Sequence, residues 1–175
     1  MNYHIESIKD EDIASCLEIY NYYIENTTIT FEEKSLTLNQ FSQRVHSIRE
    51  RYPYIVLKDE KNTVLGYCYL SEFNERSAYR ISADLSIYVS KDHQKEHIGA
   101  FLLKEIEELA KKQEIYNLIS IITSENDTSM KFHEHHGFIK EGELKDIAFK
   151  QNKVLGCSFY RKFLLDTTNL YKKTR

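Results

Sequence analysis

One stretch of the sequence constrains the fold more than any other: an alternating apolar segment followed by a polar loop and an amphipathic helix. Residues 79–89 place Ile81, Ala83 and Leu85 at every second position, which is typical of a strand. Residues 98–112 then carry apolar side chains at helical spacing on one face and Lys and Glu on the other. A strand that leads through a loop into such a helix predicts an α/β or α+β domain, in which helices cover a mixed sheet.

The other segments fit the same architecture. Thr37 and Gln40 have the spacing of a capping box at the start of a helix, and Gly137 is suited to the left-handed stop of another. Polar residues near 151–153 predict a turn between two strands. We expect strands over residues 4–8, 54–57, 64–70, 116–123, 138–144 and 154–163, and helices over residues 10–23, 38–51 and part of 124–136.

Composition limits the class of protein. With 175 residues, 41% of them hydrophobic and only one Pro, the chain is expected to form a single domain over residues 1–165, with a polar tail over 166–175 that frays. The formal net charge of −3 gives no basic excess for holding nucleic acid. No apolar run is long enough for a membrane span, and the three separated cysteines suggest free thiols in the cytoplasm.

Several polar residues are candidates for a site, each with a simpler explanation. The loop over residues 90–97 precedes a helix N-terminus and could hold a phosphate, or it is an ordinary turn. Asn126 and Ser129 could contact a ligand at a strand end, or they cap a short helix. His133 and His136 share a helix face, but the sequence lacks the histidine spacing of a zinc site, so we expect no metal.

Asp84 is the most unusual residue of the alternating strand, because it is a carboxylate among apolar neighbours. It is either a solvated residue on an open face or, if it points into a cleft, a base or electrostatic anchor. Arg76 and Tyr79 lie just before it and could bind an acidic substrate or form a surface turn. Cys68 has no nearby His to activate it, so a structural thiol is expected.

Taken together, these segments resemble the GCN5-related N-acetyltransferase (GNAT) superfamily, and within it the phosphinothricin acetyltransferase group. The resemblance runs from Ile5 to about Phe163. Six segments carry it: IYNYYIENTT (19–28), RERYPY (49–54), RSAY (76–79), ADLSIYV (83–89), NDTS (126–129) and HEHHGF (133–138).

The resemblance implies a mixed, splayed sheet with helices on both faces and acetyl-CoA in the gap between strands 79–89 and 116–123. Backbone groups of Ile87, Tyr88 and Val89 would meet the pantetheine arm. Asn126 and Ser129 would meet the cofactor near the second strand. The pyrophosphate loop would comprise Gln94, Lys95, Glu96, His97, Ile98, Gly99 and Ala100.

The sequence departs from the family pattern in two places. His97 stands where the loop has its first Gly, so we expect a strained backbone with φ above zero and the imidazole turned outward. Residues 148–156 keep only Lys150 of the stretch that the group carries on its acceptor side. This second departure leaves the identity of the amine open.

The resemblance also implies a reaction, in which a neutral amine attacks the thioester of acetyl-CoA. Asp84 matches the position of the base, and His133 is the second candidate for proton transfer or acceptor orientation. Arg76 would hold an acidic group of the acceptor, while Phe31 and Tyr79 would wall its pocket. A free amino acid or amino-acid analogue is therefore the expected acceptor, and a homodimer the expected assembly.

The sequence also allows other functions. The same fold could acetylate a protein N-terminus, a polyamine or an aminoglycoside. Alternatively, His97 and the altered stretch at 148–156 could mark a module that binds CoA without catalysis.

Overall fold

The computed structural model describes residues 3–94 and 96–172 of the chain. Within them one sheet has the strand order β1-β2-β3-β4-β5-β7-β6. The strands are β1 (His4–Ser7), β2 (Tyr54–Lys58), β3 (Val64–Glu72), β4 (Ser82–Val89), β5 (Asn117–Thr123), β6 (Ile139–Lys150) and β7 (Lys153–Phe163). The helices are α1 (Ile13–Asn26), α2 (Leu38–Arg49), α3 (Ile98–Lys112), α4 (Asp127–His135) and α5 (Thr168–Lys172), with short 3-10 turns η1 (Asp10–Asp12), η2 (Ser77–Ile81) and η3 (Lys91–His93).

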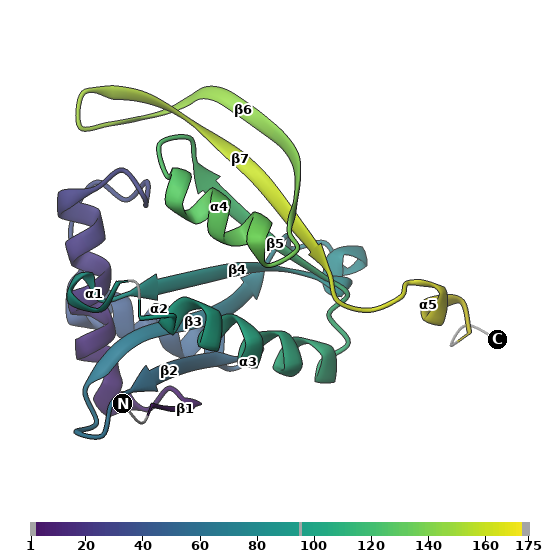
Figure 1. Ribbon diagram of the computed structural model, residues 1–175, viewed down its shortest axis with the longest axis horizontal. Coiled ribbons are helices and arrows are strands. Elements are labelled where there is room, and N and C mark those ends of the chain that lie inside the picture. Colours follow the sequence, from purple (N-terminus) through teal and green to yellow (C-terminus); the bar gives the residue numbers. More distant parts are fainter. Residues whose placement is uncertain (1–2, 95, 173–175) are drawn as a thin grey trace.

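Two apolar cores lie on opposite faces of this sheet. On one face, Leu102 and Ile106 of α3 pack with buried side chains of the central strands, such as Leu85. On the other, α1 and α2 cover a group of tyrosines that includes Tyr54 and Tyr67. Figure 1 shows α3 and α4 in front of the sheet and α1 and α2 behind it. The expected mixed sheet with helices on both faces is therefore confirmed.

The centre of the sheet holds its one parallel contact among the described strands. β4 and β5 pair in parallel only over Ser82–Asp84 and Asn117–Ile119, whereas all neighbouring pairs around them are antiparallel. Figure 1 shows the two strands leaving a common start and separating toward the end of β4. The sheet is therefore splayed at its middle, as the resemblance implies.

The sequence-based boundaries were wrong in three places. Residues 79–81 belong to η2 rather than to the strand, because the Tyr79 amide bonds back to the Arg76 carbonyl. β6 continues past residue 144 to Lys150, because its backbone stays paired with β7 as far as Lys153. Part of the tail is helical, since the Asp166 carboxylate accepts a hydrogen bond from the first amide of α5.

Two local signals were confirmed. Thr37 and Gln40 form the reciprocal capping box at the start of α2. Gly137 ends the segment after α4 with φ of +85°, a conformation that L side chains rarely adopt.

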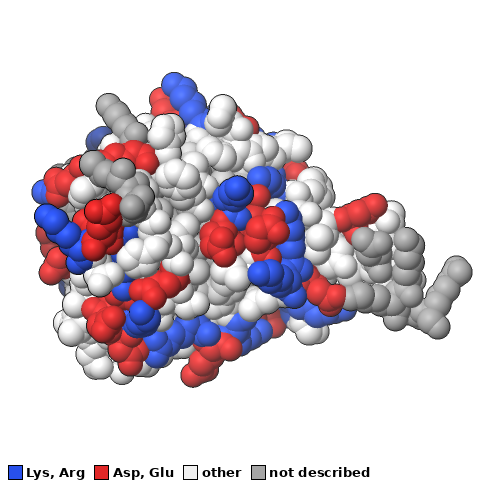
Figure 2. Space-filling view, turned by 60° about the horizontal axis from the view of Figure 1, so that its bottom comes forward, with Lys and Arg blue, Asp and Glu red and all other residues white. Residues whose placement is uncertain are grey.

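The surface and the helices add two observations on function class. On the face shown in Figure 2, acidic and basic side chains are interspersed, and no broad basic field of the kind that binds a phosphate backbone is visible. Within the described residues, no helix has both the length and the apolar composition that crossing a membrane requires.

A buried ion cluster attaches the start of the chain to the sheet. The Lys58 ammonium of β2 lies 2.6 Å from an Asp12 carboxylate oxygen and 2.7 Å from one of Glu6. The side chains of Lys58 and Asp12 are only 3% and 5% exposed, so each charge depends on the other for stabilisation.

We predict that Asp12→Asn lowers the free energy of unfolding by about 3 kcal/mol, because it leaves the buried Lys58 charge undercompensated. Urea denaturation measures this change. Glu108→Gln is the matched control, since it breaks an exposed ion pair with Lys111 on α3 and should leave the urea midpoint unchanged. Equal effects of the two substitutions would contradict the role given to the buried cluster.

Candidate active site

The separation of β4 and β5 opens a narrow cavity of about 90 Å³. Residues of both sheet faces line it, because it passes between the strands rather than over them. Ile29 from the loop after α1 contributes to the lining. The other lining residues are Leu85, Ser86, Ile87 and Tyr88 of β4, Ser120, Ile121 and Ile122 of β5, and Asn126, Ser129 and His133 of the segment that follows.

The edge of β4 that faces this cavity has free backbone positions. Beyond Asp84, β4 has no strand partner on the β5 side, while β3 stays paired on its other side as far as Val89. Ile87 and Tyr88 line the cavity, as expected for residues that contact a pantetheine arm. The Val89 carbonyl is occupied, because the Tyr23 hydroxyl donates to it at 2.5 Å. An extended ligand with amide groups fits the free edge.

The loop before α3 adopts the backbone expected for His97. This residue has φ 60° and ψ 12°, is exposed, and stands at the N-cap of the 15-residue helix α3. Its carbonyl accepts the amides of Ala100 and Phe101, so the Ile98 and Gly99 amides are left at the helix start without intrahelical partners. Such amides and the helix dipole favour an anion.

The remaining loop residues are attached to neighbouring elements. The Glu96 carboxylate accepts a hydrogen bond from the Tyr3 hydroxyl at 2.8 Å and lies 3.3 Å from His93 Nδ1. Gln94 donates to the Tyr23 hydroxyl at 3.3 Å. Lys95 lies outside the described residues.

At the far side of the cavity, Asn126 caps a helix, and its contact with a ligand stays a prediction. Its side-chain oxygen caps α4 by accepting the Ser129 amide, which confirms the capping role, and the residue also lines the cavity. His133 is 6% exposed, and its Nδ1 lies 2.8 Å from the Ser129 carbonyl. That contact requires a proton on Nδ1, and burial lowers the pKa of His133, so the imidazole is neutral and its Nε2 is an acceptor.

Asp84 lies where the parallel pairing ends. It is the last residue of β4 that pairs with β5, opposite Ile119, and its side chain alternates to the same face as those of Ser86 and Tyr88. One carboxylate oxygen is buried without a hydrogen-bond partner among the described residues. Burial raises the pKa of Asp84 to about 6. A carboxyl group in this state can take up a proton near neutral pH.

Strand alternation separates the two predicted catalytic residues. Asp84 projects to the face of β4 that α1 and α2 cover, whereas His133 packs with Phe138 and Tyr160 on the face of α3 and α4. They approach the gap between β4 and β5 from opposite sides. The arrangement allows different roles but no direct proton exchange between them.

The residues predicted to bind the acceptor come from two places. Arg76 is exposed at the start of η2, and Tyr79, 43% exposed, packs edge-on against Phe73 with ring centroids 5.6 Å apart. η2 leads directly into β4, so both lie at the end of the strand that carries Asp84. Phe31 is 38% exposed on the loop after α1, two residues beyond Ile29 of the cavity.

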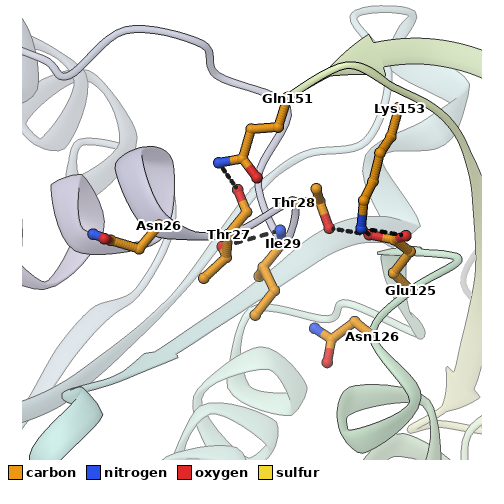
Figure 3. A pocket seen from close by; sticks show the side chains of 8 residues that line it. All are labelled: Asn26, Thr27, Thr28, Ile29, Glu125, Asn126, Gln151 and Lys153. Atoms are coloured by element: carbon orange, nitrogen blue, oxygen red, sulfur yellow. Dashed lines mark hydrogen bonds and ion pairs between the residues drawn. The ribbon is translucent and has the colours of Figure 1, made fainter.

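A second, polar cavity of about 300 Å³ was not predicted (Figure 3). It joins the first, because Ile29 and Asn126 line both. Figure 3 shows Thr28 and Lys153 converging on Glu125, with distances of 2.9 Å from the Thr28 hydroxyl and 2.9 Å from the Lys153 ammonium. In the sequence these residues look like ordinary turn residues, and only the fold brings them together.

Lys150, the one residue that the stretch 148–156 shares with the group's pattern, has a structural role. Its side chain is 4% exposed, and its ammonium donates to the Thr30 carbonyl at 2.7 Å. Burial lowers the pKa of Lys150. The contact attaches the end of β6 to the loop that carries Ile29 and Phe31, so Lys150 holds one wall of the site in place.

The protein combines a splayed mixed sheet, a free strand edge and a helix N-terminus. This combination is found in a known enzyme family. Residues 5–155 match the family described as Acetyltransferase (GNAT) domain, and the chain belongs to this family. It is therefore an N-acetyltransferase.

Within the family, the relatives point to one group. The chain is 26% identical over 151 residues to phosphinothricin N-acetyltransferase of Streptomyces viridochromogenes, covering 86% of this chain and 82% of the relative. It is 29% identical to the L-methionine sulfoximine/L-methionine sulfone acetyltransferase of Pseudomonas aeruginosa, covering 87% and 91%. The crystal structure of a phosphinothricin acetyltransferase from Sinorhizobium meliloti in complex with AcCoA is similar with a TM-score of 0.89 and 30% identity, covering 93% and 89%.

We predict from the raised pKa that Asp84→Asn stabilises the protein at high pH. At pH 8 the carboxylate is charged in both the folded and unfolded states, but burial disfavours the charge only in the folded state. The variant should therefore be more stable than the original chain at pH 8, by up to about 3 kcal/mol. The difference should shrink as the pH falls through 6 toward 4, because the folded carboxyl then becomes protonated.

Urea denaturation at several pH values measures this dependence. Asp146→Asn, which changes an exposed carboxyl on β6, is the control and should give a difference that does not vary in this pH window. A pH-independent difference for Asp84→Asn would contradict the raised pKa.

Proposed function

We propose that the protein transfers the acetyl group of acetyl-CoA to the free amine of a small molecule, an amino acid or amino-acid analogue of the phosphinothricin or methionine sulfoximine type. The observation that carries this proposal is the buried, unpartnered carboxylate oxygen of Asp84 at the point where β4 and β5 separate. The names of the relatives support the choice of acceptor.

The residues of the site fit acetyl-CoA. The free edge of β4 at Ile87 suits the amides of the pantetheine arm, and the amides at the start of α3 suit the pyrophosphate. The backbone of Tyr88 alternates to the β3 side, so Tyr88 can contribute only its side chain to this cavity. Asn126 and Ser129 lie across the cavity from that edge. When bound, the thioester supplies an activated acetyl group, and this chain supplies orientation and proton transfer.

In this proposal Asp84 removes the proton from the acceptor ammonium, directly or through a water molecule. An amine with a pKa near 10 loses its proton more readily to a carboxylate whose pKa is raised to about 6 than to an ordinary one near 3.9. The neutral amine then attacks the thioester carbon and forms a tetrahedral oxyanion, which a donor must stabilise. His133, neutral with Nε2 free, orients a group from the opposite side of the gap.

The acceptor is proposed to bind at the end of β4 where η2 lies. The Arg76 guanidinium can form a bidentate contact with a carboxylate or phosphinate, and Tyr79 and Phe31 offer exposed aromatic surface. These groups and Asp84 together would hold a molecule that carries an acidic group close to its amine.

We predict that Arg76→Ala raises the acceptor KM by about tenfold or more with a smaller effect on kcat, because a charge-assisted contact to the ground-state acceptor is lost. Steady-state kinetics with the preferred amine measure this. Arg80→Ala is the matched control, since Arg80 lies in the same turn and donates to the Ser77 carbonyl at 3.4 Å. An unchanged KM for Arg76→Ala would reject its role as the acceptor's anchor.

We predict that His97→Gly raises the free energy of unfolding by up to about 1 kcal/mol and tightens acetyl-CoA binding, because glycine relieves the positive φ and lets the backbone approach the pyrophosphate. Thermal unfolding and calorimetric titration measure the two effects. Asn62→Gly relieves a similar φ of 63° in the turn before β3 and should leave the acetyl-CoA affinity unchanged. Weaker binding by His97→Gly would show instead that the imidazole itself holds the cofactor.

We also propose that the protein forms a homodimer in the cytoplasm. The β5–β7–β6 end of the sheet exposes large apolar side chains, including Ile121 (50%), Ile139 (58%) and Phe163 (51%), which a second copy would cover. The three cysteines are buried free thiols, a state that fits a reducing compartment.

Release of the CoA thiol by purified protein tests the function. The acceptor panel contains phosphinothricin, methionine sulfoximine, methionine sulfone, amino acids, a polyamine and an N-terminal peptide. We expect turnover with the amino-acid analogues. Turnover only with the polyamine or the peptide would assign a different amine, and acetyl-CoA binding without any turnover would favour a binding module.

A further inference from the structure

Ser120 of β5 is a buried hydroxyl that the proposed mechanism does not use. It is 2% exposed, and its Oγ has no hydrogen-bond partner among the described residues. A buried hydroxyl that has lost water and gained no partner costs free energy, so its presence in a folded domain calls for an explanation. A ligand that supplies the missing partner is one.

The position of Ser120 identifies which ligand atoms it can reach. Ile119 is the last residue of β5 that pairs with β4, so Ser120 is the first residue beyond the closed end of the gap. Ser120 also lines the cavity between the two strands. Asp84, opposite Ile119, lies one residue before this level on β4, and its side chain approaches from the other face of the sheet. An amine activated at Asp84 must meet the thioester here, which places the sulfur end of the arm beside Ser120.

The other hydroxyl and imidazole groups of this cavity each have a neighbour within hydrogen-bond distance. The Ser86 hydroxyl hydrogen-bonds with Tyr69, and the Ser129 hydroxyl lies 3.3 Å from His133 Nδ1. His133 uses its Nδ1 proton on the Ser129 carbonyl and has only an acceptor left. Because His133 Nδ1 carries a proton, the Ser129 hydroxyl can only accept there and keeps its own proton, but Ser129 is only half-buried. Ser120 is therefore the fully buried hydroxyl of this cavity that has no partner of any kind within the described chain.

We propose that the Ser120 hydroxyl donates a hydrogen bond to the sulfur of the CoA thioester and stabilises the thiolate as it leaves; this inference rests on the proposed function. The amine nitrogen forms the new C–N bond, the C–S bond breaks, and its electron pair stays on sulfur. Ser120 keeps its proton throughout. The amine gives up two protons during the reaction: the thiolate takes up one and the other passes to solvent.

Titration calorimetry with CoA and with desulfo-CoA, which lacks the sulfur, tests the contact without requiring turnover. We expect Ser120→Ala to weaken CoA binding by about tenfold and to leave desulfo-CoA binding unchanged. Because the variant removes an unpartnered hydroxyl, the melting temperature of the ligand-free protein should stay the same or rise. The variant should also lower kcat and leave the amine KM unchanged.

Ser158→Ala is the matched control, because it removes a hydroxyl that is 1% exposed on the neighbouring strand β7, outside the cavity lining. It should change neither affinity. Equal weakening of CoA and desulfo-CoA by Ser120→Ala, or no weakening of either, would overturn the sulfur contact while leaving the proposed function in place. Failure of the original chain to bind CoA at all would overturn both.

Discussion

The parallel pairing between β4 and β5 stops after three residues, and the whole candidate site depends on that interruption. Each strand has a longer antiparallel pairing on its other side. β4 pairs with β3 over seven residue pairs, from Gly66↔Val89 to Glu72↔Ala83. β5 pairs with β7 over seven residue pairs, from Asn117↔Phe163 to Thr123↔Cys157. Because each strand follows its antiparallel neighbour, the twist of the sheet separates them. The gap therefore comes from the fold itself and exists without a ligand.

The interruption also explains the electrostatics of the site. Asp84 is the last residue of β4 that pairs with β5. One of its carboxylate oxygens is buried there without a hydrogen-bond partner, and burial raises the pKa of the carboxyl group. Ser120 lies one residue beyond the end of the pairing on β5, and its side chain alternates to the face of Leu118 and Ile122, opposite that of Asp84. Two buried polar groups without partners near the end of this pairing are costly for the free protein. Both become explicable when a thioester and an amine meet between them.

The sequence predicts the features that depend on local chemistry. Thr37 and Gly137 each specify a backbone conformation through their own side chain or its absence, and each adopts it. The positive φ of His97 was expected only from the resemblance, because the family has Gly at this position. Asp84 stood out because a carboxylate interrupts an apolar alternation. The boundaries at residues 79–81 and 145–150 failed because tertiary pairing, rather than local preference, decides them.

The features that the sequence does not predict are those created by long-range contacts. Nothing adjacent to Ser120 distinguishes it from a serine that has a partner. The contact between Lys150 and Thr30 joins residues 120 positions apart, and Glu125 meets Lys153 only because the β6–β7 turn lies next to the end of β5. The acceptor side is therefore the part of the site that sequence patterns describe least.

A crystal structure of the protein with acetyl-CoA tests the central claim most directly. The account predicts that the pantetheine arm lies between β4 and β5, bonded to the free edge at Ile87, with its thioester near Asp84 and Ser120. An arm bound outside this gap, or strands that close together when the cofactor binds elsewhere, would contradict it.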